Sequence, residues 1–392
     1  MAAAQLTATW NYPTNVRFGP GRIAELAAAC RSLGMQRPLL VTDRGLKQSE
    51  IVGRALDVCQ QDDLPVGMFA EVQGNPVERN VSDGVTAFRD GGHDGVVAFG
   101  GGSAIDTAKN VALMVGQSRP LLDFVDEGEN WRRVETAGMA PMVAVPTTAG
   151  TGSEVGRSAV VTDAASRTKR VIFHPRMLPA IVIADAELTL GLPPAITAAV
   201  GMDALSHSLE AYCADGYHPM GDGIALEGMR LIRHWLARAV ADGGDLEART
   251  HMLAAASMGA VAFQKGLGAM HAMSHPCSAH YDTHHGLTNA VLMPYVLLYN
   301  RPAIEAKLAL LARYLGLGDG FDAVLAWVLE LRREIGIPES LAEIGVPADK
   351  AGFLARLAEA DPLTALNPRP VDAAAYFQLY ERALSGDLTP FP

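Results

Sequence analysis

The sequence predicts an α/β domain with a parallel sheet over residues 1–190 and an all-helical domain over residues 191–392. Short apolar runs alternate with helix-length segments in the first half, which is the pattern of βαβ units. After Pro193 and Pro194 the periodicity of apolar residues is helical almost throughout. A chain of 392 residues also exceeds what one hydrophobic core usually supports, so two domains are expected.

Strand and helix signals follow one another in order through the first half. The run RPLLVT at 37–42 is typical of a strand buried on both faces of a parallel sheet. Strands are predicted at 14–19, 37–42, 65–69, 95–99 and 142–145, and helices at 22–33, from the turn after residue 43 to about 57, at 77–90 and at 104–115.

The second half contains only helical signals until the C-terminus. We place the domain boundary near residue 190, where the pattern changes. Helices are predicted at 194–201, 202–214, 221–241, 246–265, 271–280, 285–299, 303–314, 321–335, 348–358 and 371–384.

Composition excludes several classes of function. The net charge is −11 and no cluster of Lys and Arg occurs, so nucleic-acid binding is not expected. No apolar run approaches 18 residues and the N-terminus lacks a signal-peptide pattern, so we expect no membrane association. The four cysteines form no C-x-x-C pair, which argues against a disulfide framework and favours the reducing cytoplasm.

Two loops at predicted strand ends have the composition of phosphate-binding loops. The first, 100–103 (GGGS), lies between a buried strand and a helix, where glycines let backbone N–H groups approach a phosphate. The second, 146–154 (PTTAGTGSE), follows the strand at 142–145. Simple turn chemistry would explain one such loop, but two at the carboxyl edge of one sheet favour a nucleotide.

Asp43 ends the second predicted strand and bears on the choice of nucleotide. A carboxylate there accepts hydrogen bonds from a ribose 2′-OH and repels a 2′-phosphate, which favours NAD over NADP. A turn or helix-capping role explains Asp43 equally well. Lys169 has the reach and charge of a cofactor contact, although a surface lysine is the commoner case.

The helical half carries a constellation typical of a metal site. Asp203 and His207 are four residues apart, as are His271 and His275, so each pair projects from one helix face. His285 adds an imidazole from another segment. One carboxylate and three imidazoles suit Fe(II) or Zn(II), although helical histidines are more often only hydrogen-bonded. The predicted ligands are Asp203, His207, His271 and His285, and we expect metal and cofactor to meet at a cleft between the domains.

Five segments, in order, resemble the signatures of the iron-containing (group III) alcohol dehydrogenase family: GGGSAIDTAKN, PTTAGTGSEV, GMDALSHSLEAY, AMHAMSHP and THHGLTNAVLMPY. The resemblance implies a dehydroquinate synthase-like fold, an NAD(H)-dependent dehydrogenase or aldehyde reductase, and a homodimer. It supports the same four metal ligands and places His275 beside the nicotinamide, as a proton relay, a substrate positioner or a structural residue. The cofactor-binding positions that it implies are Asp43, Asn75, Gly101, Gly102, Ser103, Thr147, Thr148, Lys169 and Leu188.

Two positively charged residues, Arg157 and Lys265, depart from the plain alcohol dehydrogenases of this family and bear on the choice of substrate. Arg157 and Lys265 would suit a substrate with a distal carboxylate or phosphonate, as in a 4-hydroxybutyrate dehydrogenase-like branch. In the alternative, Arg157 pairs with a structural carboxylate and Lys265 is solvated. A neutral short-chain alcohol or diol dehydrogenase, a zinc glycerol dehydrogenase-like enzyme and a non-catalytic metal-binding protein are the other hypotheses. His284, beside a predicted ligand, has no assigned role.

Overall fold

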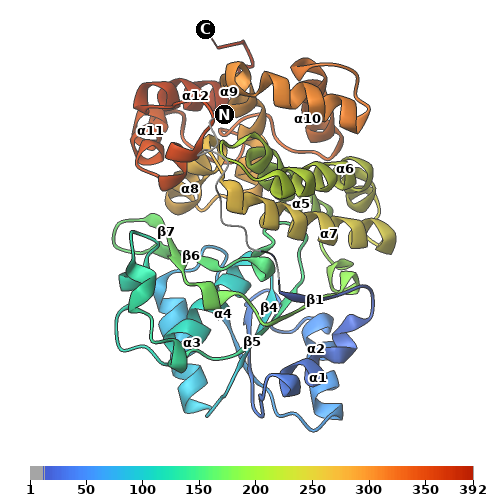
Figure 1. Cartoon of the computed structure of the whole chain (residues 1–392), viewed down its shortest axis with the longest axis vertical. Coiled ribbons are helices and arrows are strands. Elements are labelled where there is room, and N and C mark those ends of the chain that lie inside the picture. The colour runs from blue at the N-terminus through green and yellow to red at the C-terminus, as the bar shows by residue number, and fades with distance from the viewer. Residues whose placement is uncertain (1–11, 13, 392) are drawn as a thin grey trace. The chain divides into compact units, whose positions relative to one another are not determined.

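The computed structural model describes Tyr12 and residues 14–391, and the chain divides into an α/β unit, Tyr12–Gly191, and a helical unit that begins at Leu192. Figure 1 shows a central sheet with flanking helices in the first unit and helices alone in the second. The predicted fold class is therefore confirmed. The N-terminal segment assessed for a signal peptide lies mostly outside the described residues.

All neighbouring strands of the main sheet are parallel, in the order β1-β8-β5-β4-β2-β3. From β2 the chain adds β3 on one side, and then β4, β5 and β8 successively on the other. The point between β2 and β4 is where open α/β sheets bind ligands, at the carboxyl ends of the strands. The strands are β1 (Asn15–Phe18), β2 (Leu39–Asp43), β3 (Gly67–Val72), β4 (Val96–Gly100), β5 (Met142–Pro146) and β8 (Ile181–Ala184).

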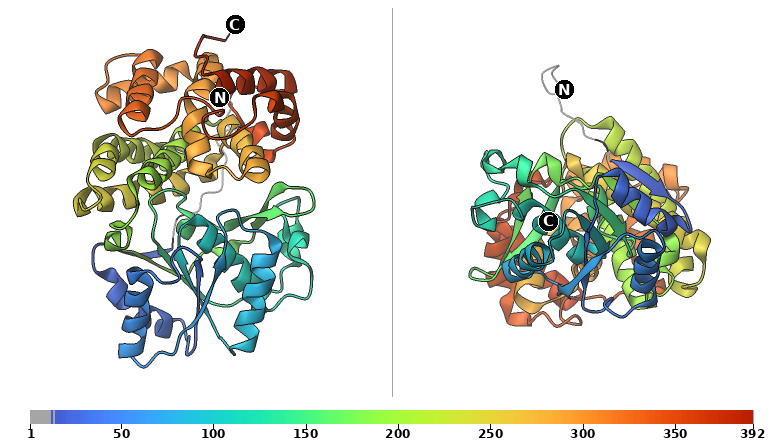
Figure 2. Two further views of the ribbon diagram at one scale, coloured as in Figure 1. Left: turned by 180° about the vertical axis from the view of Figure 1, so that it is seen from behind. Right: turned by 90° about the horizontal axis from the view of Figure 1, so that it is seen from below.

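Helices cover both faces of this sheet (Figure 2). Alternate residues of the inner strands, such as Leu40, Phe99 and Val143, are fully buried in one core with α1 and α2. The period of two is what a strand buried on both faces provides. The helices of the unit are α1 (Leu26–Ser32), α2 (Glu50–Gln61), α3 (Glu78–Asp90) and α4 (Gly102–Met114).

Three strands of this unit were not predicted from the sequence. β6 (Ser158–Asp163) and β7 (Thr168–Phe173) form an antiparallel hairpin, and β8 is the strand between β1 and β5. β7 is half-buried along most of its length and carries three polar or charged residues, so it lacks an apolar signal. β8 is fully buried but only four residues long, which is too short to show a period.

The helical unit is built around long buried helices. Its helices are α5 (Pro194–Cys213), α6 (Pro219–Ala241), α7 (Leu246–Ala262), α8 (Ala269–Tyr281), α9 (His285–Leu315), α10 (Phe321–Glu334), α11 (Ala351–Glu359) and α12 (Ala373–Ser385). Among the described residues, none of these helices has the length and apolarity needed to cross a membrane.

Two predicted helix boundaries were wrong. α5 continues through Gly201, where a Cβ would lie 2.2 Å from Leu236 Cδ1, so the glycine serves close packing against α6 rather than a helix end. α9 continues through Pro302 and joins the two helices predicted at 285–299 and 303–314. Burial along α9 outweighs the loss of one backbone hydrogen bond at the proline.

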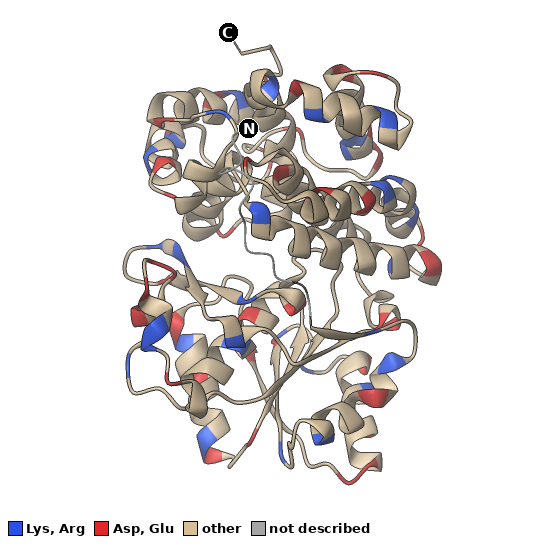
Figure 3. Ribbon diagram, in the orientation of Figure 1, with Lys and Arg blue, Asp and Glu red and all other residues tan. Residues whose placement is uncertain are grey.

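The charged residues and the cysteines are distributed as follows. Positive and negative residues are interspersed over both units in the view of Figure 3. All four cysteines, Cys30, Cys59, Cys213 and Cys277, are free and buried.

Candidate functional site

Three helices of the helical unit carry the predicted metal ligands. α5 holds Asp203 and His207 one turn apart, α8 holds His271, and α9 begins at His285. α5 and α9 approach closely because Gly286 has no side chain: a Cβ there would lie 2.6 Å from Ala199 O and 2.9 Å from Asp203 Cβ. The glycine beside His285 thus brings two ligand-bearing helices together.

The four predicted ligands lie close to one another. Ligand atoms of Asp203, His207 and His271, all three buried, lie within 4.8 Å of one another. His285 Nε2 is 3.9 Å from Asp203 Oδ1, and its ring centroid is 5.3 Å from that of His271. His285 is therefore adjacent to the cluster but lies outside its tightest group of three. The rings of His207 and His271 stack, with centroids 4.9 Å apart.

The side chain of Asn289 marks the point on which these donors converge. Its Nδ2 lies 3.0 Å from Asp203 Oδ1, 3.2 Å from His271 Nε2 and 3.2 Å from His285 Nε2. An amide has two hydrogens and cannot satisfy three acceptors at once. A cation can accept all three lone pairs, so the donor set fits a divalent metal ion better than it fits the amide.

The electrostatics of the cluster favour the protonation states that a metal requires. Burial raises the pKa of Asp203, but the facing His207, His285 and His271 outweigh it and lower the pKa to about 2. Desolvation lowers the pKa of His285 well below its ordinary value; Asp203 opposes this shift and the nearby imidazoles add to it. The carboxylate is therefore ionised and His285 neutral, as metal ligands must be.

The side chain of Glu210 contacts the ligand His271. Glu210 extends from α5, and its Oε2 lies 2.7 Å from His271 Nδ1. The same carboxylate accepts hydrogen bonds from Gly268 N and Met270 N at the start of α8. With its Nδ1 hydrogen donated to Glu210, His271 presents the lone pair of Nε2 to the cluster.

His275 lies next to the cluster and has a carboxylate partner of its own. Its ring stacks on His285 with centroids 5.6 Å apart, and its Nδ1 lies 2.8 Å from Asp361 Oδ2. Asp361 also accepts a hydrogen bond from Leu363 N at the start of the short helix Pro362–Leu366. Asp361 thereby orients the ring and leaves Nε2 of His275 as the nitrogen for exchange of a proton.

In the α/β unit, the predicted cofactor residues at β2 and β4 lie together at the switch point of the sheet. A Cβ at Gly100 would lie 3.4 Å from Asp43 Oδ2, and Thr147 N donates to Gly100 O at 3.0 Å. Asp43 Oδ1 accepts a hydrogen bond from Leu46 N at 3.1 Å, so Asp43 does fill the turn role that the sequence left open. Its second oxygen has no hydrogen-bond partner among the described residues.

Glycines allow the two phosphate-type loops to approach each other. A Cβ at Gly102 would collide with Thr151 Cγ2 at 2.5 Å, and one at Gly101 would lie 3.3 Å from Thr148 Oγ1. Any side chain at Gly102 would separate the loops. The backbone N–H groups at the start of α4 therefore lie beside the hydroxyls of the 146–154 loop, which suits a phosphate.

The remaining predicted cofactor residues lie at the same edge of the sheet. The side chain of one of them, Leu188, points into the core instead. Lys169 Nζ donates to Asn75 Oδ1 at 2.7 Å, and Ser103 Oγ donates to the carbonyl of neighbouring Gly74. Leu188, on the short helix Ala186–Thr189 after β8, is buried in the core with α1 and α2. The side chain of Leu188 is therefore not available to a ligand.

Two charged side chains of α4, the buried Lys109 and the half-buried Asp106, anchor the second loop, and neither was predicted from the sequence. Lys109, 1% exposed, donates to Ser153 O, to Ser153 Oγ at 2.9 Å and to Ser158 O at 2.9 Å. Asp106 accepts from Ser153 Oγ at 2.5 Å and from Val160 N at 2.9 Å. The signal was present, since both residues belong to the quoted segment GGGSAIDTAKN.

The two cations suggested for the substrate differ in their surroundings. The Arg157 guanidinium lies 5.4 Å from the centre of the Phe173 ring and has no ion pair among the described residues. Its charge acts on Asp126, whose pKa is raised by burial and lowered in part by Arg157.

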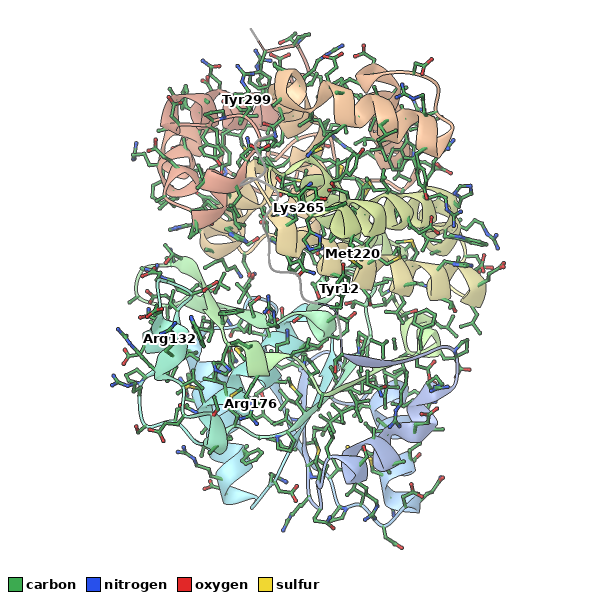
Figure 4. The ribbon with its side chains drawn as sticks, viewed as in Figure 1. Tyr12, Arg132, Arg176, Met220, Lys265 and Tyr299 are labelled. Carbon is green, nitrogen blue, oxygen red and sulfur yellow. The ribbon has the colours of Figure 1, made fainter. Side chains whose placement is uncertain are left out.

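Lys265 is neither solvated nor available to a substrate. This side chain, labelled in Figure 4, is 2% exposed, with Nζ 2.5 Å from Asp222 Oδ1 and 3.2 Å from Tyr212 O. Its charge is neutralised by Asp222 in the first turn of α6, so we do not propose Lys265 as a substrate contact. His284, also without an assigned role, accepts from Leu287 N and caps α9.

Comparisons with known proteins find similarity over nearly the whole chain. The family models described as "Iron-containing alcohol dehydrogenase" and "Fe-containing alcohol dehydrogenase family, C-terminal" match residues 13–186 and 197–384. A 4-hydroxybutyrate dehydrogenase from Cupriavidus necator is 39% identical over 95% of this chain and 99% of its own length. An NAD-dependent methanol dehydrogenase from Bacillus methanolicus is 35% identical over 94% and 97%. The crystal structure of a 1,3-propanediol oxidoreductase superposes with a TM-score of 0.91 at 35% identity, covering 96% of this chain and 100% of that one.

Proposed function

This chain belongs to the iron-containing alcohol dehydrogenase family and is an NAD-dependent alcohol dehydrogenase, and we propose that its substrate is a hydroxy acid of the 4-hydroxybutyrate type, interconverted with its semialdehyde. A phosphonoaldehyde belongs to the same chemical class, with an anion at the end distant from the carbonyl. The relatives named above act on small alcohols. The proposal therefore concerns the chemical group at the end of the substrate distant from the reacting carbon.

Arg157 is the observation that carries the proposal. It lies three residues after the 146–154 loop at the carboxyl end of β5, it is half-buried, and it has no ion pair among the described residues. A guanidinium held against an aromatic ring is well suited to bind a carboxylate through two parallel hydrogen bonds. The 39% identity to a 4-hydroxybutyrate dehydrogenase supports the same assignment.

We propose that Asp203, His207, His271 and His285 hold the metal, with Fe(II) as the first candidate and Zn(II) as the alternative. A divalent ion lowers the pKa of an alcohol and polarises an aldehyde carbonyl, and the nicotinamide accepts or delivers the hydride. His275, oriented by Asp361, would relay the alcohol proton towards solvent. The edge between β2 and β4 would bind NAD(H), with Asp43 selecting against a 2′-phosphate.

The decisive measurement is an NADH-oxidation assay of Fe(II)-loaded wild type and Arg157→Ala on succinate semialdehyde and on butanal. Loss of a charge-assisted bond of about 1.5–3 kcal/mol should lower kcat/KM for the semialdehyde by about 10- to 160-fold. The same change should alter kcat/KM for butanal by less than about threefold.

Arg170→Ala is the matched control, because Arg170 lies in the same unit and pairs with Glu127 at the surface. It should leave both substrates unaffected. Equal wild-type rates on the two aldehydes, or equal losses in Arg157→Ala, would instead favour a neutral short-chain alcohol or diol as substrate.

Two further proposals concern the assembly and its location. We propose a homodimer in the cytoplasm, as the family resemblance and the four free cysteines suggest. Light scattering on the purified protein and cell fractionation test these separately from the chemistry.

A further inference from the structure

The start of α8 depends on side chains from elsewhere in the helical unit. The first backbone N–H groups of a helix have no partner within it. Here Gly268 N and Met270 N donate to Glu210 at 2.9 and 2.7 Å, and Ala269 N donates to Asn367 Oδ1 at 3.1 Å. Glycine at 268 is required for this arrangement, because a Cβ would lie 2.8 Å from Asn367 Oδ1 and 3.2 Å from Glu210 Oε1.

Glu210 also belongs to the helix that carries two of the predicted ligands. It lies seven residues after Asp203 on α5, two turns along the same face, and it is 7% exposed. A buried carboxylate is costly unless it is fully hydrogen-bonded. Glu210 meets this condition with three donors, and the third of them is His271 Nδ1 at 2.7 Å.

We propose that Glu210 is the positioning residue of the metal centre: it fixes α8 against α5 and holds the proton of His271 on Nδ1, so that Nε2 faces the metal. This inference rests on the proposed metal site. A carboxylate, unlike an amide, offers acceptors only, which is what three converging N–H groups require. Its negative charge at the first turn of α8 is also stabilised by the helix dipole.

His285, like His271, has a hydrogen-bond partner at Nδ1. Ser274 Oγ donates to His271 O, so it accepts from His285 Nδ1 at 3.2 Å and leaves Nε2 of His285 facing Asn289. This contact is long and neutral, whereas the contact of Glu210 is short and charged. Charge-assisted hydrogen bonds are about twice as strong, so Glu210 dominates the arrangement.

The substitution Glu210→Gln tests the hydrogen-bonding role of Glu210 without changing the volume of its side chain. The amide keeps the shape but turns one acceptor into a donor, which must then face either Met270 N–H or His271. If it faces His271, the imidazole proton moves to Nε2, on the side of the metal. We expect the dissociation constant for Co²⁺ or Zn²⁺, measured by competition with a chelator, to rise about 10- to 100-fold.

Two reference variants make the result specific. Asp185→Asn is the matched control: Asp185 is a fully buried carboxylate that accepts from Gly21 N, Ile23 N and Glu187 N and contacts no ligand. It should lower the melting temperature but leave the metal dissociation constant within twofold of wild type. Asp203→Asn provides the baseline for loss of a ligand.

A measurement on the wild type does not depend on whether Glu210→Gln folds. In protein labelled with ¹⁵N-histidine, the metal-free His271 signal, assigned from its loss in His271→Asn, should report a proton on Nδ1. A proton on Nε2, or unchanged metal affinity in folded Glu210→Gln, overturns the role of Glu210. Failure of the wild type itself to bind metal would overturn the metal site instead, so the two failures are distinguishable.

Discussion

The two units prepare their binding groups in opposite ways. In the helical unit the donors are side chains on three rigid helices, and buried acceptors such as Glu210 orient them. In the α/β unit the expected contacts are backbone N–H groups and hydroxyls on two loops, the second of which is anchored by Lys109 and Asp106 through Ser153. Function in the first case resides in particular atoms of particular side chains, and in the second it resides mainly in the path of the backbone.

The comparison predicts that single substitutions in the helical unit have the larger effects. Asp203→Asn removes the one carboxylate of the cluster and leaves an amide facing Asn289 Nδ2. We expect retained metal after dialysis to fall below about a tenth of wild type and kcat/KM to fall by about 10³-fold, because a Lewis acid contributes several kcal/mol. Binding of NADH, followed by fluorescence, should be unchanged. Full metal content in Asp203→Asn would contradict the claim that metal binding in the helical unit depends on this single side chain.

A smaller effect is expected where a side chain acts through another. Asp361→Asn weakens the contact that orients His275, so we expect kcat to fall about tenfold, with little change in KM for NADH or in metal content. Asp372→Asn is the control, because Asp372 also caps a helix, through Ala375 N, without contacting a histidine. Equal losses of kcat in the two variants would mean that Asp361 acts only as a helix cap.

The same contrast explains what the sequence revealed about each unit. Spacing of four residues identified Asp203 with His207 and His271 with His275, because a helix converts spacing directly into a shared face. The placement of Asp43 and of the two glycine-containing loops at the carboxyl ends of strands followed from the rules of parallel sheets, whereas the order of the strands was not predicted. The fold class and the neighbourhood of both sites were therefore predictable.

Residues that act by holding others were not predictable in the same way. Glu210 and Asp361 lie 61 and 86 positions from the histidines they contact, and no local pattern records such a pairing. Lys265 shows the opposite error, since its charge suggested a substrate contact while Asp222, 43 positions away, neutralises it. Partners this distant in sequence are set by tertiary packing alone.

The smallest predicted effect concerns the anchor of the α/β unit. Burial lowers the pKa of Lys109 to about 8, against the opposing attraction of Asp106 and Glu154. An unfolded lysine titrates near 10.5, so between pH 8 and 10.5 the unfolded chain binds more protons than the folded one. This group alone therefore makes the folded unit more stable as pH rises through that window, by at most about 1.4 kcal/mol per pH unit.

Lys109→Met should lose this slope although it also loses the hydrogen bonds to Ser153 and Ser158 and is less stable at every pH. Melting temperatures of wild type and variant between pH 7.5 and 10 should accordingly diverge as the pH rises. Lys47→Met, at an exposed lysine of the same unit, controls for the loss of one charge. Parallel curves for wild type and Lys109→Met would mean that Lys109 keeps its proton in the folded protein over this pH range.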